Sequence, residues 1–261
     1  MILVGTAGFS YADWKGRFYP VDLKERDMLA YYAREFPAVE IDFTYYRLPT
    51  VRGMAGMAAK TGDGFEFCIK AYKGMTHEAS APVEEPGRTF QAFREALGPL
   101  RDTGRLGCVL AQFPWSFKPS PRSLAYLEEF RERLDGIPVV IEFRNNEWVK
   151  EETFSFLEAK GLGFCCVDEP ALPGLMPRLV RATSSLAYVR FHGRNAAKWW
   201  RHKEAWERYN YLYTEEELRG WVPKVRALDT QAEKTYVFYN NCHAGHAAEN
   251  ARMMQTLLAL E

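Results

Sequence analysis

Ionisable side chains recur at every second position near the ends of two short apolar runs. Glu142 and Arg144 lie two positions apart in one run, and Arg190 and His192 do so in the other. Because successive side chains of a β-strand point to opposite faces, residues two apart share a face. A carboxylate, guanidinium groups and an imidazole on one surface can bind an anion and transfer protons. The spacing therefore predicts a charged site carried by strands.

The same alternation places polar residues on one face of further runs, opposite mostly apolar faces. In a barrel of parallel strands the helix-facing side is apolar, so the polar sets should point inward near the C-terminal mouth, where such barrels carry their sites. The alternative is that these charges are structural ion pairs that fill the barrel top. The further pairs are Glu40 and Asp42, Cys68 and Lys70, Leu110 and Gln112, Cys166 and Asp168, and Phe238 and Asn240.

Four of these residues are candidates for catalysis, namely Glu142, His192, Lys70 and Asp168. Glu142 is the first choice for a general acid or base, because its surroundings can tune the pKa of an inward carboxylate flanked by cations. Lys70 is the second reactive candidate, since a lysine beside other cations can lose its proton and form a Schiff base. A salt bridge from Lys70 to nearby acidic residues is the simpler interpretation, and we expect it.

An anion site is expected where the seventh and eighth runs end. Barrels of this kind often hold phosphate after strands seven and eight, at the N–H groups of a helix start. The alternative is that Asn241 or His243 only caps the helix and that Arg190 pairs with Glu142 or Asp168. The residues expected at the anion site are Arg190, His192, Arg194, Asn240 and Asn241.

No metal and no cofactor are expected. Lys70, Arg144 and Arg190 share the predicted mouth with the carboxylates and would repel a divalent cation. The His243-x-x-His246 spacing lacks the pattern of a zinc helix, and the Gly5 to Gly8 turn is not a dinucleotide fingerprint.

The elements that must position these residues are eight short runs rich in β-branched and aromatic residues. Eight runs in 261 residues give about 33 residues per unit, close to a strand with its crossover helix. The repeat predicts an α/β fold, a single (β/α)8 TIM barrel over residues 1–261. The runs are Ile2 to Gly5, Val39 to Asp42, Phe65 to Lys70, Gly107 to Gln112, Pro138 to Phe143, Gly163 to Asp168, Ala187 to His192 and Thr235 to Asn240.

Helix signals separate most of the runs. Asp22 with Glu25 and Thr214 with Glu217 resemble capping boxes, and Pro223 predicts a kink or a shortened turn in the second helix. Prolines after the sixth run predict an irregular unit there, and 194–213 forms a long insertion after the seventh. Further helices are expected over Val51 to Lys60, Arg88 to Leu97, Pro121 to Leu134, Trp148 to Lys160 and His246 to Leu260.

Composition excludes several classes of protein. With 34 basic and 34 acidic residues the formal net charge is +0, so no global attraction to nucleic acid or an anionic membrane exists and any anion site must be local. Apolar runs are too short for a membrane span, and Met1 leads directly into a strand rather than a signal peptide. Five cysteines without metal spacing fit a reducing compartment, so we expect a cytoplasmic location. Oligomeric state is not encoded in any pattern we find.

The insertion after the seventh run combines aromatic and basic side chains. This combination is typical of a surface on which a base or sugar ring stacks beside a phosphate, and equally of a lid that packs on the barrel. The residues are Trp199, Trp200, Trp206, Tyr209, Tyr211 and Tyr213 with Lys198, Arg201, Lys203 and Arg208.

The chain resembles the YecE-like family, the domain of unknown function seventy-two, over essentially its whole length. This resemblance implies a (β/α)8 barrel but no reaction. The matching stretches are GTAGFSYADWKGRFYP at 5–20, VEIDFTYYRLP at 39–49, FEFCIKA at 65–71 with His77, QFPWSF at 112–117, IEFRNNEW at 141–148, VDEP at 167–170, YVRFHGRN at 188–195, RYNYLYTEEEL at 208–218, and YNN at 239–241 with Gly245, Asn250 and Ala251.

The resemblance also implies which residues form the mouth. This chain departs from the family pattern at Phe9, where tryptophan is usual, at Asp42, where asparagine is usual, and at Cys242, where aspartate is common. The implied mouth residues are Glu40, Tyr46, Arg47, Lys70, His77, Gln112, Glu142, Arg144, Asp168, Arg190, His192, Asn240 and Asn241.

Three functions are consistent with these patterns. The leading hypothesis is an enzyme that acts by acid–base chemistry on a small phosphorylated or polyhydroxylated substrate. The second is a barrel that binds nucleic acid or cleaves phosphodiesters through the insertion. The third is a noncatalytic ligand-binding barrel. Their partners would be a small anionic molecule in the first and third cases and nucleic acid in the second, with no membrane in any.

Overall fold

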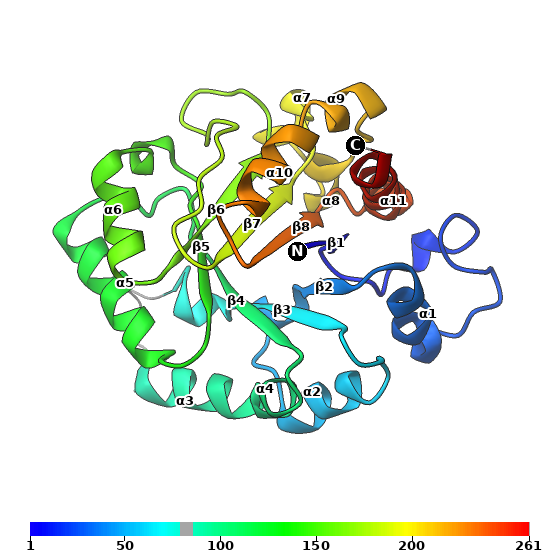
Figure 1. Ribbon diagram of the computed structural model, residues 1–261, viewed down its shortest axis with the longest axis horizontal. Coiled ribbons are helices and arrows are strands. Elements are labelled where there is room, and N and C mark those ends of the chain that lie inside the picture. The colour runs from blue at the N-terminus through cyan, green and yellow to red at the C-terminus, as the bar shows by residue number, and fades with distance from the viewer. Residues whose placement is uncertain (79–85, 261) are drawn as a thin grey trace.

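Eight parallel strands form the centre of the computed structural model, which describes residues 1–78 and 86–260 (Figure 1). They are hydrogen-bonded in the order β1-β8-β7-β6-β5-β4-β3-β2, so each strand from β2 to β8 pairs with its sequence neighbours in this range and β1 pairs with β8, and the predicted (β/α)8 barrel is confirmed. The strands are β1 Ile2–Thr6, β2 Ala38–Ile41, β3 Glu66–Lys70, β4 Leu106–Gln112, β5 Val139–Glu142, β6 Gly163–Asp168, β7 Leu186–Phe191 and β8 Lys234–Tyr239.

The barrel closes between β1 and β2 without a regular ladder. A single parallel bridge joins Ala7 to Glu40, and the amide of Gly8 donates to the Glu40 carbonyl at 2.7 Å. Gly5 lets the strands approach, because a Cβ atom there would lie 2.1 Å from the Ala38 carbonyl oxygen. The close approach of β1 to β2 therefore requires glycine at position 5.

A helix side chain completes this seam. The hydroxyl of Tyr32 accepts from the Thr6 amide at 2.8 Å and donates to the Ala38 carbonyl at 3.1 Å. Tyr32 lies on α1 (Met28–Glu35) and is fully buried. One phenol thus bridges the backbones of β1 and β2, where direct hydrogen bonds are few.

Helices surround the strands, and most begin within a few residues of their expected starts (Figure 1). The Thr214–Glu217 capping box is present, and Pro223 lies in the first turn of a new helix, so the predicted break is real. Asp22 caps nothing, because 3-10 turn η2 (Glu25–Asp27) precedes α1. The others are α2 Val51–Ala58, α3 Pro86–Ala96, α4 Gly98–Asp102, α5 Pro121–Arg133, α6 Glu151–Ala159, α9 Glu215–Arg219, α10 Val222–Asp229 and α11 His246–Leu260.

Short turns and the insertion build the rim of the mouth. Four 3-10 helices follow strands directly: η3 (Phe43–Tyr45), η4 (Lys73–Met75), η5 (Asn146–Trp148) and η6 (His243–Gly245). No helix separates β6 from β7, as the prolines predict. The insertion forms α7 (Ala196–Trp199) and α8 (Ala205–Tyr209).

The opposite end of the barrel is sealed by a separate polar contact. Lys234 approaches Glu66 at 2.6 Å, and the Tyr236 hydroxyl donates to the same carboxylate. Cys68 and Cys108, partners in register on β3 and β4, lie buried between the two ends. These contacts fill the end of the barrel opposite the C-terminal mouth, where barrels of this fold carry their sites. Within the described residues no helix has the length and apolar character needed to cross a membrane.

Candidate functional site

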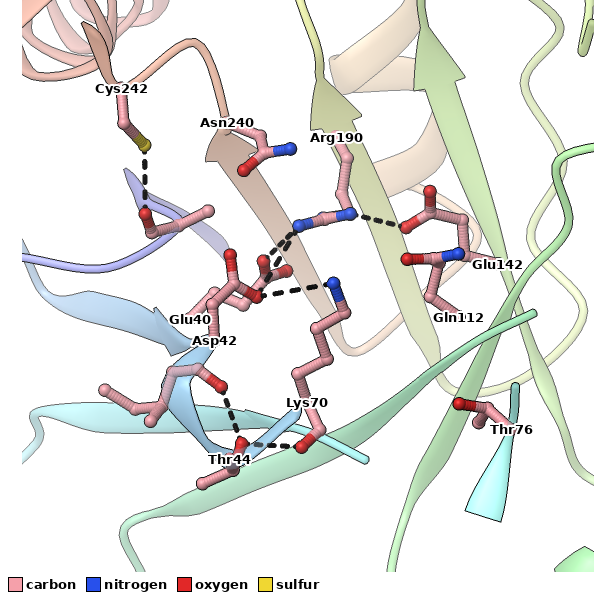
Figure 2. A network of polar contacts seen from close by, with 12 residues as sticks. Glu40, Asp42, Thr44, Lys70, Thr76, Gln112, Glu142, Arg190, Asn240 and Cys242 are labelled. Atoms are coloured by element: carbon pink, nitrogen blue, oxygen red, sulfur yellow. Dashed lines mark hydrogen bonds and ion pairs between the residues drawn. The ribbon is translucent and has the colours of Figure 1, made fainter. Parts of the chain in front are cut away.

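A chain of alternating charges crosses the interior of the barrel below the mouth. Arg190 lies between Glu40, at 2.5 Å, and Glu142, at 2.7 Å. Arg144 continues the chain from Glu142, at 2.7 Å, to Glu169, at 3.2 Å. Figure 2 shows Arg190 between the carboxylates of β2 and β5. We call these five residues the mouth network.

Glu142, expected to act as a general acid or base, is instead held in the centre of this network by its ion pairs. Its side chain is fully buried, and the His192 ring nitrogen Nε2 lies 3.1 Å from its second oxygen. Burial opposes ionisation, but Arg144, Arg190 and His192 outweigh it and hold the pKa of Glu142 well below its usual value. Glu142 therefore remains ionised and serves as a counter-ion for the cations around it.

Arg190 and His192 are likewise occupied by the protein itself. Arg190 is fully buried, so it is closed to a ligand, and the ion-pair interpretation replaces the expected anion site. Asn240 Nδ2 lies 3.0 Å from His192 Nδ1, so the contact partners assign the ring proton to Nε2, facing Glu142. Burial, followed by the charge of Arg144, holds the pKa of His192 well below its usual value. His192 is thus a neutral, sealed imidazole.

Strand β6 presents the opposite face from the one expected. Val167 is the register partner of the inward Arg190, whereas Asp168 pairs with Phe191, which faces the helices. Asp168 therefore points out of the barrel, and the prediction that it belongs to the mouth is wrong. The next inward position after Val167 is Glu169, which was not among the expected site residues. Glu169 lies in the VDEP stretch, and it would have been identified if the odd-numbered rather than the even-numbered residues of this strand had been taken as facing inward.

Asp168 instead forms a second buried assembly between the strands and the helices. It accepts from Arg194 Nε at 2.8 Å and Nη2 at 2.6 Å, from the Tyr213 hydroxyl at 2.9 Å and from Trp221 Nε1 at 2.7 Å. Arg194 also donates to Glu217 at 2.7 Å. We call these residues the outer cluster. Arg194 is therefore removed from the anion site predicted for it.

The turn after β8 is also used for packing. Asn241 faces outward and donates to the Tyr211 carbonyl at 2.8 Å and to Asn250 at 2.9 Å. The Cys242 thiol is buried and donates to the Ala7 carbonyl at 3.0 Å. Burial raises the pKa of Cys242 far above its usual value, which disfavours the thiolate.

Two hollows open above the mouth network. One, of about 320 Å³, is bordered by Trp115 and Trp200, and we call it the Trp200 hollow. The other, of about 510 Å³, is bordered by Trp206 and Phe43, and we call it the Trp206 hollow. Both hollows are lined by Tyr46, Lys70, Arg144 and Tyr209, so they meet at these four residues.

Lys70 is the cation at the floor of both hollows. Its ammonium lies 3.9 Å from Asp42 Oδ1 and 4.7 Å from the centre of the Tyr45 ring, and Figure 2 shows it extended toward Asp42. The predicted salt bridge is present, but it is loose. Lys70 is 14% exposed and Arg144 11%, whereas Arg190 is closed. Asp42 Oδ1 is buried, and no donor in the described residues makes a hydrogen bond to it.

His77 faces the Trp200 hollow beside the two cations. Its Nδ1 lies 3.0 Å from the Thr76 hydroxyl, and its Nε2 lies 3.5 Å from the Gln112 amide nitrogen. Burial, followed by the charges of Lys70 and Arg144, lowers its pKa to about 4. His77 is therefore neutral near pH 7, and with Gln112 it lines the hollow as the family resemblance implied.

The insertion lies over both hollows. The Trp206 ring stacks on His243 with centroids 4.2 Å apart, and Trp200 meets Trp115 edge to face at 6.5 Å. Trp200 and Trp206 remain 54% and 47% exposed, whereas Trp199 is buried. Arg47, expected at the mouth, is exposed over the Phe43 ring and lines neither hollow.

The described residues contain no group of three His, Cys, Asp or Glu side chains placed to hold a metal ion. Lysine and arginine separate the carboxylates at the mouth. The donor set therefore suits an anion or a hydroxyl-bearing molecule.

Fold and mouth together define a TIM-barrel protein with polar, aromatic-walled hollows at the C-terminal ends of its strands. The chain belongs to the family described as "Protein of unknown function DUF72", whose model matches residues 3–261.

Relatives agree with this assignment. The UPF0759 protein YunF of Bacillus subtilis is 33% identical over 100% of this chain and 96% of its own length. The UPF0759 protein YecE of Escherichia coli is 30% identical over 52% of this chain and 45% of its own length. A crystal structure of a DUF72 family protein from Thermotoga maritima has a TM-score of 0.90 and 42% identity, and the match covers 99% of each chain.

Proposed function

We propose that this protein is an enzyme whose active site is the barrel mouth and whose substrate is a small phosphorylated molecule with hydroxyl groups. Lys70 and Arg144 bind the anionic group, and His77 transfers a proton. One observation carries the proposal: the Trp200 hollow joins a neutral imidazole to Lys70 and Arg144, two of the three cations that line it.

Anion binding is supported by the difference between these cations and Arg190. A loose ion pair leaves the Lys70 ammonium able to form new charge-assisted hydrogen bonds. Arg144 is held in place by Glu142 and Glu169, which fixes its guanidinium before a ligand arrives. In this scheme Glu142, our first choice for acid–base chemistry, is a positioning residue.

Proton transfer by His77 is supported by the cause of its low pKa. Lys70 and Arg144 contribute to that low value, so an anion bound to both would offset their charge. The pKa of His77 would then rise toward its usual value near 6.5, and the imidazole would become a competent base in the complex. Substrate binding would thus prepare the proton acceptor.

Nucleic-acid binding remains the second candidate, because Trp200 and Trp206 are exposed beside the exposed cations Arg201 and Lys203. The same tryptophans line the hollows, however, which favours a small ligand. Salt dependence separates the two, since a strand loses affinity by roughly 0.7 log units per phosphate contact for each tenfold rise in salt.

The test is a panel of phosphorylated metabolites and their dephosphorylated counterparts, observed by ligand NMR with the wild-type protein, Lys70→Met and His77→Gln. We expect saturation transfer to phosphorylated compounds that weakens in Lys70→Met, and a chemical change in at least one compound that is lost in His77→Gln although binding remains. Arg101→Met is the control, because Arg101 is exposed on α4, outside both hollows.

Two results would contradict the proposal. If Lys70→Met leaves every bound compound unaffected, the anion does not bind at the mouth. If compounds bind in a Lys70-dependent way and none is converted over the whole panel, the noncatalytic ligand-binding barrel is the correct reading.

A further inference from the structure

Two cations are shared by the two hollows, and a third, Arg208, lines the Trp200 hollow alone. Lys70 and Arg144 line both the Trp200 hollow and the Trp206 hollow. An anionic group bound to both cations would therefore have space on either side of it. A ligand that fills the site would carry a substituent on each side of its charge.

Each side offers an aromatic wall for such a substituent. The Trp200 hollow is bordered by Trp115 and Trp200, which are 42% and 54% exposed. The Trp206 hollow is bordered by Phe43 and Trp206, which are 37% and 47% exposed. Exposed aromatic faces stack on flat rings at little conformational cost. Both substituents should therefore be flat or ring-shaped.

The charge around the junction favours a single negative charge on the ligand. Lys70, Arg144 and Arg190 face four carboxylates: Glu40, Asp42, Glu142 and Glu169. Arg208 adds a fourth cation at the Trp200 hollow, and burial raises the pKa of Glu40 and of Glu169 to about 7, so proton uptake makes the mouth weakly but not strongly positive. A phosphate monoester carries nearly two negative charges at pH 7, whereas a diester carries one.

We propose that the ligand of this mouth is a small phosphodiester, with its phosphate at Lys70 and Arg144 and one ring-bearing group in each hollow. The inference rests on the proposed function, because it assumes that the two cations bind an anion. It adds the chemical class of the ligand and gives each wall of the mouth a separate role.

The test compares three probes by isothermal titration calorimetry at constant ionic strength. Bis(4-nitrophenyl) phosphate carries two rings, 4-nitrophenyl phosphate carries one ring and a second charge, and diethyl phosphate carries none. We expect the first to bind at least tenfold tighter than either of the others. Equal or tighter binding of 4-nitrophenyl phosphate would overturn the inference.

Substitutions assign the two rings to the two walls. Trp200→Ala and Trp206→Ala should each weaken bis(4-nitrophenyl) phosphate by about tenfold, and the double variant by roughly the product, while diethyl phosphate is unaffected. Both side chains are half exposed, so both variants should fold. Leu212→Ala is the matched control, since Leu212 is an exposed apolar residue of the same segment and lines neither hollow. An effect of only one tryptophan would contradict the two-sided ligand.

A phosphodiester with a ring-bearing group on each side occurs both in a dinucleoside phosphate and at every linkage of a nucleic-acid strand. Thymidylyl-thymidine and a ten-residue oligothymidylate separate these sources. We expect similar affinities per site and a salt slope of about 0.7 for both, because the hollows enclose one phosphate. Much tighter binding of the oligomer, with a salt slope several times steeper, would overturn the proposal of a small ligand and indicate that the mouth binds a nucleic-acid strand.

The failures of the two proposals are distinguishable. If monoester and diester bind equally well and both depend on Lys70, the two-sided ligand is wrong and the proposed anion-binding site stands. If Lys70→Met changes the affinity of no probe, the proposed function fails as well.

Discussion

The mouth network and the outer cluster are both built from buried ion pairs, but they differ in how completely their charges are paired and exposed. Each centres on buried carboxylates paired with arginine near the C-terminal ends of neighbouring strands. In the outer cluster Asp168 accepts four hydrogen bonds, and its five members line neither hollow. At the mouth, Lys70 and Arg144 are partly exposed and Asp42 has an oxygen without a hydrogen bond among the described residues. The two regions therefore differ in the exposure and pairing of their charges, and this difference supports the proposed site at the mouth.

The largest effect is expected from removing the central cation of the mouth network. Arg190→Met leaves Glu40 and Glu142 buried without their shared partner, so the free energy of unfolding should fall by roughly 3–5 kcal/mol. Urea unfolding measures this loss. Arg101→Met, which removes an exposed cation on α4, should stay within about 0.5 kcal/mol of the wild type. A similar loss in both variants would contradict a stabilising role of the mouth network.

Breaking the outer cluster should lower stability without affecting ligands. Asp168→Asn removes the charge that holds Arg194, and we expect a loss of roughly 2–3 kcal/mol in the free energy of unfolding. Binding of bis(4-nitrophenyl) phosphate at a temperature where both proteins are folded should remain unchanged. If that affinity falls as far as in Lys70→Met, the distinction between the two regions is wrong.

Lys70→Met should show the opposite pattern. Its pair with Asp42 is long and partly exposed, so the free energy of unfolding should change by less than about 1 kcal/mol. Loss of a charge-assisted hydrogen bond should weaken anion binding roughly 10- to 100-fold. Calorimetry and urea unfolding on the same preparation measure both quantities. A stability loss without a binding loss would place Lys70 among the structural ions.

A smaller effect concerns the dependence of stability on pH. The folded pKa of Glu169 is raised to about 7, above that of the unfolded chain, so the folded state binds more protons between about pH 4.5 and 7. The contribution of Glu169 is therefore present below pH 4.5 and is lost as the pH rises through 7. Glu169→Gln should reduce this decline, by less than about 1.4 kcal/mol per pH unit, in urea unfolding at pH 5, 6 and 7. An unchanged slope would show that Glu169 does not titrate there.

The smallest effect is expected at His77. Removing a nearby cation in Lys70→Met should raise the pKa of His77 from about 4 toward its usual value. NMR titration of the imidazole resonances measures the shift, and Asp168→Asn serves as the control because the outer cluster does not contact His77. A pKa that stays the same in Lys70→Met would show that Lys70 does not contribute to it.

The fold could be predicted from the sequence because each unit carries its own local signals. Strand runs, the Thr214 capping box and the prolines after β6 act over a few residues, so they can be recognised without knowledge of the rest. Lys70 and Gln112 were placed at the mouth by strand alternation and by the family resemblance, His77 by the resemblance alone, and all three line the Trp200 hollow.

Two features of the site depend on distant partners and were not predictable. The face of β6 is set by its register with β7, and the alternation of Gly163–Asp168 does not show which side faces the helices. Pairing of Arg190 with Glu142 was one alternative to the anion site, but the strand pattern shows only that Arg190 points inward and could not decide between carboxylates 48 and 150 residues away and a ligand. Pairing of buried charges is decided by geometry across the barrel.

The β1–β2 seam, which the Tyr32 hydroxyl holds in place of a regular ladder, should be the part of the barrel that opens most readily. The N-terminal ammonium is bound to Asp229 at 2.7 Å, and β1 is paired in register with β8 along its length. Local opening of the barrel would therefore leave β1 paired with β8 and separate β1 from β2. Hydrogen exchange should be faster at the Thr6 amide than along the β7–β8 ladder, and Tyr32→Phe, which keeps the ring but removes the bridge, should accelerate it further.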